Sequence, residues 1–189
     1  MGQLVNFDFS RVDELIAGYV VVYNFMRFAS DLLHDGQKML ITLAPGESQA
    51  DPALRAQLAE RFHVDLTLYD WTLPAKIVQA IGAQVDPNIP VVDLTAYFQC
   101  RSEAGEKLYH PHNTHWSLEG NALAGQVIAS YMLQNWFGAS VILPQDLQAC
   151  AATKEQVEPK TSAEAIHTLI ADRFFPTIRS DAEQKMGQP

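Results

Sequence analysis

The chain has 189 residues, of which 48% are hydrophobic, so it is long enough for one domain with a sizeable core. Its 13 basic and 22 acidic residues give a formal net charge of −9. Because neutralising phosphates requires a cationic surface, this balance excludes a general nucleic-acid binder. No apolar run approaches the ~18 residues of a membrane span, and the first residues do not resemble a secretion signal.

Hydrophobic periodicity and capping residues predict alternating helices and strands along the chain. The predicted helices cover residues 11–34, 51–62, 71–81, 95–101 and 117–136, and the predicted buried strands cover residues 38–43 and 90–94, with a short edge element over 64–68. This order implies parallel strands covered by helices, which is an α/β layered architecture.

The predicted domain covers residues 1–137 and is followed by a C-terminal extension over residues 138–189. The extension is expected to begin as an irregular polar segment, to form one amphipathic helix over residues 162–175 and to end in a loose tail. Two strands are few, because sheets usually contain ~4–6 strands. The domain is therefore expected to be incomplete on its N-terminal side, with an exposed sheet edge through which a second copy could pair.

Several aromatic and polar side chains have simple structural interpretations. Tyr19, Tyr23 and Phe28 recur at helical spacing and are assigned to the core of the first predicted helix. Trp71 lies near a helix start and is expected to be a packing anchor rather than part of a substrate groove. Ser117 is expected to cap the helix that follows it.

The two cysteines, Cys100 and Cys150, are too few for a disulfide framework and lack the paired spacing of a zinc or redox motif. We interpret them as two ordinary thiols, with one disulfide between them as the alternative. The redox compartment, and with it the localisation, is left open.

The most specific pattern lies in residues 109–124, where His115 is followed by Trp116, the capping Ser117 and Gly120. A histidine in a loop beside the sheet, just before a helix, is well placed for acid–base chemistry. In acyl transfer such a histidine takes the proton of a nucleophilic serine and returns it to the leaving group. The segment resembles the terminal block of SGNH/GDSL hydrolases, closest to the branch of alginate O-acetyltransferase-like proteins.

The resemblance covers about residues 20–135, including the strand–loop segments at residues 40–45 and 90–95. It implies an SGNH or flavodoxin-like three-layer fold, of which this chain would be the C-terminal portion. It also implies an esterase or O-acyltransferase that acts on a small-molecule or carbohydrate ester, with His115 as general base. Such chemistry needs no metal and no organic cofactor.

Two positions depart from the family pattern. Asn113 stands where the family has its catalytic Asp, and an asparagine offers the histidine a hydrogen bond without a charge; the equivalent change in a serine protease costs about 10⁴ in kcat. Asp93 is a candidate substitute. The Gly-Asp-Ser nucleophile block is absent, although residues 46–48, Gly-Glu-Ser, imitate it and make Ser48 a candidate nucleophile. The alternative for Ser48 is a turn serine, so weak or no activity is expected from this chain alone.

Three other interpretations of the histidine segment stay open. His110, His112 and His115 match the histidine spacing of metallo-β-lactamase-type zinc motifs and could bind zinc in a hydrolase. A degenerate, non-catalytic SGNH-like module would keep the fold and bind a partner. Three surface histidines without a function are the simplest interpretation.

Overall fold

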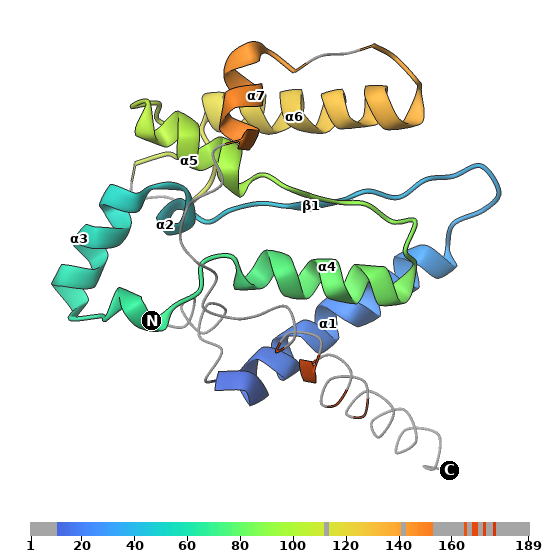
Figure 1. Cartoon of the computed structure of the whole chain (residues 1–189), viewed down its shortest axis with the longest axis horizontal. Helices are drawn as coiled ribbons and strands as arrows, with labels where there is room; N and C mark the ends of the chain where they lie inside the picture. The colour runs from blue at the N-terminus through green and yellow to red at the C-terminus, as the bar shows by residue number, and fades with distance from the viewer. Residues whose placement is uncertain are drawn as a thin grey trace. The chain divides into compact units, whose positions relative to one another are not determined.

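The computed structural model describes residues 11–111, 114–140 and 143–152, together with the single positions 165, 168, 169, 172 and 176 (Figure 1). Its elements are α1 (Val12–Asp31), β1 (Ile41–Leu43), α2 (Glu47–Ala50), α3 (Pro52–Phe62), the 3-10 helix η3 (Leu66–Leu68), α4 (Leu73–Val85), β2 (Val91–Asp93), α5 (Thr95–Glu103), α6 (Leu118–Trp136) and α7 (Gln145–Ala152). None of the described helices combines the length and apolar character needed to cross a membrane.

The chain divides into two compact units, each assembled from separate segments. Unit 1 contains Met1–Ile41, Thr67–Val91 and Glu158–Pro189, and unit 2 contains Thr42–Leu66 and Val92–Val157. Unit 2 therefore contains both the residues that follow β1 and the histidine segment.

The strands β1 and β2 pair with each other in a two-stranded sheet. Ile41 N donates to Pro90 O at 3.0 Å, and Leu94 N donates to Leu43 O at 3.2 Å. Both strands thus advance in the same direction, and the pair is parallel. The predicted combination of helices with parallel strands is confirmed at this level, while the three-layer arrangement stays a prediction.

Three of the predicted helices begin at residues whose capping side chains or prolines favour a helix start. Asp51 caps α3, because its Oδ1 accepts the Leu54 amide at 2.9 Å, and Pro52 is the first helical residue. Pro74 lies in the first turn of α4, where its missing N–H costs nothing. Ser117 caps α6, as predicted.

The C-terminal extension and two shorter segments differ from the prediction. Residues 145–152 form helix α7 instead of an irregular segment, because Leu147 and Cys150 are buried against the rest of unit 2. The predicted edge element becomes the 3-10 turn η3. Residues 47–50 form the short helix α2, and the amide of Gly46, the residue just before the helix, donates to Gln49 Oε1 at 3.0 Å. The helix predicted over residues 162–175 and the tail lie outside the described residues, single positions excepted.

The described core of unit 1 lies between α1 and α4, which Figure 1 shows side by side. Tyr19 and Tyr23 are buried there, as predicted, and burial raises the pKa of Tyr19 to about 12. Trp71 is buried as well. The assignment of Phe28 to the core is wrong, because Phe28 lies on the opposite face of α1 and is 62% exposed.

Asp70 is a buried carboxylate just before α4. Its Oδ1 accepts the Thr72 amide at 2.9 Å and the Thr72 hydroxyl at 2.6 Å, and its Oδ2 accepts Lys76 Nζ at 3.0 Å. Burial by itself raises the pKa of Asp70, but the bonds from Thr72 and Lys76 outweigh burial and hold the pKa below its ordinary value. The ionised carboxylate therefore stabilises the folded unit.

We expect Asp70→Asn to lower the free energy of unfolding at pH 7 by roughly 1–3 kcal/mol. Since the folded-state pKa is depressed, this stabilisation is present above the unfolded-state pKa and is lost as the pH falls through the folded-state value. The difference from the wild type should therefore shrink in acid, as measured by urea unfolding at neutral and acidic pH. Asp35→Asn, at an exposed position, is the control. An equal deficit at both pH values would contradict the assignment.

Unit 2 is built around helices α5 and α6, with α2 and α7 packed against α5. Its core consists of the buried residues Ala50, Leu94, Phe98, Leu108, Tyr109, Leu123, Ala124, Val127, Leu147 and Cys150. Several of these flank the histidine segment in sequence, so the segment is anchored in the core at its ends.

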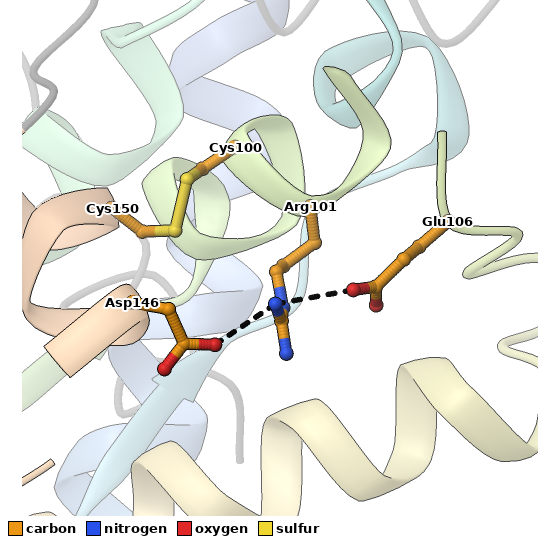
Figure 2. The surroundings of a disulfide bond; sticks show 5 residues. All are labelled: Cys100, Arg101, Glu106, Asp146 and Cys150. Atoms are coloured by element: carbon orange, nitrogen blue, oxygen red, sulfur yellow. Dashed lines mark ion pairs between the residues drawn. A yellow bond between two sulfur atoms is a disulfide. The ribbon is translucent and has the colours of Figure 1, made fainter. Parts of the chain in front are cut away.

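A disulfide between Cys100 and Cys150 joins α5 to α7 (Figure 2). The interpretation of these cysteines as two ordinary thiols is wrong. Arg101, beside the disulfide, makes a second link, because its Nη1 lies 2.9 Å from Asp146 of α7 and 3.2 Å from Glu106. One covalent bond and one ion pair therefore hold α7 on unit 2.

Candidate functional site

The histidine segment is a loop whose two ends are paired. Tyr109 and Trp116 form an antiparallel bridge. Next to it, His110 N donates to His115 O at 3.0 Å and Ser117 N donates to Leu108 O at 2.9 Å. His110 and His115 are exposed at the rim of this loop, whereas His112 and Asn113 lie outside the described residues.

The first turn of α6 packs directly against the loop. Ser117 Oγ accepts the Gly120 amide at 3.1 Å and donates to Lys107 O at 2.7 Å. A Cβ atom on Gly120 would lie 2.3 Å from Leu108 O and 3.1 Å from Trp116 Cβ, so this position requires glycine. Trp116, Ser117 and Gly120 thus fix how the histidine loop leads into the helix.

An aromatic cluster supports the base of the loop. The Phe98 ring, from α5, lies 4.9 Å from the Trp116 ring and 5.9 Å from the Tyr109 ring. Phe98 is fully buried and Tyr109 nearly so. The backbone beside His115 is therefore held by packing, while the His115 side chain itself stays exposed.

Tyr109 also connects the histidine loop to the segment that follows β1. Its hydroxyl donates to Pro45 O at 2.7 Å, and the bond is buried. Burial raises the pKa of Tyr109, and the nearby Glu47 contributes in the same direction, so the hydroxyl keeps the proton that it donates. Pro45 immediately precedes Gly46 and α2, which carries Ser48. Within the described residues, this hydrogen bond links the Ser48 segment to the histidine segment.

We expect Tyr109→Phe to lower the free energy of unfolding of unit 2 by about 1–2 kcal/mol, because the Pro45 carbonyl would lose a buried partner. Urea unfolding followed by tryptophan fluorescence measures this loss, since Trp116 lies next to the bridge. Tyr131→Phe removes the hydroxyl of a partly exposed tyrosine on α6 and is the control. Equal effects of the two substitutions would show that the Pro45 bond contributes nothing.

Two buried polar side chains hold α2 in place. Arg55 Nε donates to Ser48 O at 3.1 Å, and Arg55 Nη2 donates to Gln49 O at 3.2 Å. Gln99 Nε2, from α5, donates to the same Gln49 carbonyl at 2.9 Å. Sequence reasoning missed both side chains, because an arginine in a helix and a glutamine in a helix are normally solvent-facing, and no signal in the sequence marks them as buried.

The structure brings some of the predicted site residues together and leaves others apart. Ser48 and His115 both belong to unit 2, and the Tyr109 bond ties their segments, but within the described residues Ser48 Oγ makes no hydrogen bond to His115. Ser48 is half-buried at the second position of α2. Asp93, the candidate substitute carboxylate, accepts the amide and hydroxyl of Thr95 through its Oδ1 at 3.0 and 2.6 Å.

A carboxylate lies near the histidine loop, but the described residues do not form a metal-binding cluster. The backbone amide of Glu119 and the Ser117 hydroxyl lower the pKa of Glu119, with a smaller contribution from His110, so one carboxylate lies near the loop. Among the residues that the structure describes, no three histidine, cysteine, aspartate or glutamate side chains cluster as metal ligands would. The predicted zinc set includes His112, which lies outside those residues, so it stays a prediction.

No family model, curated protein or solved structure matches the chain. The likeness to SGNH hydrolases therefore rests on the residues of the histidine block and on the two strand–loop segments.

Proposed function

We propose that unit 2 is an SGNH-like ester-processing module, an esterase or O-acyltransferase in which Ser48 is the nucleophile and His115 the general base. The observation that carries the proposal is the buried bond from Tyr109 to Pro45, which ties the serine segment to the histidine loop. The position of Ser48 adds to it, since Ser48 follows a strand and a short turn at the start of a helix. Strand–turn–helix segments of this kind commonly present nucleophiles.

The chemistry follows from the two side chains. Ser48 Oγ would attack the ester carbonyl carbon while His115 takes the hydroxyl proton, and His115 would then return this proton to the departing alcohol. The resulting acyl-serine would be released to water in hydrolysis or to an acceptor hydroxyl in acyl transfer, which makes the substrate a small-molecule or carbohydrate ester. Activity should be weak, because Asn113 replaces the family's carboxylate and Asp93 already accepts two bonds from Thr95.

A fluorophosphonate probe tests this proposal directly, because it forms a phosphonate ester only with an activated serine and releases fluoride. We expect slow labelling of the full chain, located at Ser48 by peptide mass spectrometry. Ser48→Ala and His115→Ala should both abolish labelling. Ser140→Ala, at an exposed serine of the same unit, should not change it. Labelling that persists in His115→Ala would contradict the role given to His115.

A second candidate is a non-catalytic module with the same fold. It is favoured by the folding roles of Trp116, Ser117 and Gly120, which account for much of the motif without catalysis, and by the half-buried position of Ser48. If the folded wild type shows no labelling at Ser48, this candidate replaces the enzymatic one. Far-UV circular dichroism on the same sample shows whether the chain is folded.

A further inference from the structure

Helix α1 is apolar on two opposite faces. One face is buried beside α4 and contains Leu15, Ile16, Tyr19, Tyr23 and Met26. The other face contains large apolar side chains with exposed fractions of 69% for Val21, 70% for Phe25, 62% for Phe28 and 55% for Leu32. A helix that is apolar on both faces is normally covered on both, and contiguous exposed apolar patches mark interaction sites.

The spacing of this exposed stripe, defined as Val21, Phe25, Phe28 and Leu32, indicates what kind of surface covers it. Successive members are separated by four, three and four residues. This is the alternation of a and d positions in a coiled-coil seam, which packs against the side of another helix. The stripe is therefore a surface that the side of a second helix can cover.

We propose that the exposed stripe binds the same stripe of a second copy, with the two α1 helices antiparallel. The stripe is symmetric about a point between Met26 and Arg27, so reversal maps it onto itself. Val21 then faces Leu32 of the partner subunit, and Phe25 faces Phe28 of the partner subunit. An antiparallel pair also places each helix N-terminus beside the partner's C-terminus, which the helix dipoles favour.

The residues beside the stripe are compatible with this pairing. Val22 and Ala29 flank it on one side, and Asn24 and Asp31 flank it on the other. In the antiparallel arrangement the apolar flank meets the partner's apolar flank, and Asn24 meets Asp31 of the partner subunit. An asparagine amide can donate to that carboxylate. Arg27 remains 3.9 Å from its own Asp31, so the seam opposes no like charges.

The seam is short, so the dimer should be weak. Stable interfaces usually bury at least about 1,200 Å², and the exposed area of four side chains from each copy falls below this, in the range of weak and transient contacts. We expect a dissociation constant on the order of 10 µM. This dimer differs from pairing through a sheet edge, because it uses α1 of unit 1 and leaves β1 and β2 unchanged.

Sedimentation equilibrium on the full chain tests the proposal. The wild type should approach twice the monomer mass as its concentration rises, and Phe25→Glu and Phe28→Glu should remain monomeric with unchanged circular dichroism. Phe137→Glu replaces an equally exposed phenylalanine at the end of α6, 70% exposed, and should dimerise like the wild type. A monomeric wild type, or equal loss of dimer in Phe137→Glu, would overturn the proposal.

Cysteine cross-linking tests the orientation. The chain's own two cysteines are joined to each other, so single introduced thiols can be followed without interference. A mixture of Phe25→Cys and Phe28→Cys copies should form a mixed disulfide under mild oxidation, faster than either variant cross-links with itself. Preferential cross-linking of Phe25→Cys with itself would indicate parallel helices and overturn the antiparallel pairing.

Discussion

Replacing Cys100 and Cys150 together with serine is expected to lower the free energy of unfolding of unit 2 by about 4 kcal/mol. The disulfide links positions separated by 50 residues, and closing a loop of that length lowers the conformational entropy of the unfolded chain by an amount equivalent to about 4 kcal/mol. Removal of the disulfide should destabilise α7 first, because α7 is otherwise held by the buried Leu147 and by the ion pair from Arg101 to Asp146 (Figure 2).

The measurement is urea unfolding of wild type and double variant, each with and without dithiothreitol. Reductant should destabilise the wild type to about the level of the variant and should leave the variant unchanged. If the wild type has the same unfolding midpoint with and without reductant, the bond does not contribute to stability. Arg101→Gln is then the variant that shows how much of the attachment of α7 depends on the ion pair.

Replacing Gly120 with alanine is expected to destabilise unit 2 by about 3 kcal/mol. The added methyl group would meet Leu108 O at 2.3 Å, and the carbonyl cannot move away freely because it accepts the Ser117 amide at 2.9 Å. To relieve the overlap, α6 would have to shift away from the histidine loop. The same variant should therefore also lose any labelling at Ser48.

Gly125 provides a matched control in the same helix. A Cβ atom there would have no neighbour within 4 Å, so Gly125→Ala should raise the free energy of unfolding by about 0.5–1 kcal/mol through higher helix propensity. The two substitutions are chemically identical and should have opposite signs in thermal unfolding. A mild, equal effect of both would show that Gly120 does not need the close approach to Leu108.

The fold was predictable from the sequence where local chemistry decides it. Asp51 with Pro52 and the capping Ser117 each begin a helix at the expected position, because the interactions that start these helices are made within a few residues. Helix α7 was not predictable, since it depends on a disulfide and an ion pair to distant α5. Phe28 has the periodicity of a core residue, but periodicity cannot tell which of two apolar faces is covered.

The candidate site was predictable only in part, for a related reason. The sequence identified His115 and the residues that shape its loop, because they are neighbours along the chain. It did not indicate that Tyr109 reaches Pro45 or that Arg55 is buried beneath α2, since the partners lie 64 and 7 residues away and follow from packing. Trp116, Ser117 and Gly120, which the sequence analysis compared with a catalytic block, stabilise the histidine loop through the bridge, the helix cap and the close approach to Leu108.

The most direct test of the central claim, that Ser48 and His115 act together, is a double-mutant cycle on p-nitrophenyl acetate hydrolysis. Ser48→Ala and His115→Ala should each reduce the catalysed rate by about 10²-fold or to background. Because a nucleophile and its base act as one unit, the double variant should be no slower than either single variant. Losses that multiply in the double variant, or a rate that neither substitution changes, would contradict the proposed pairing.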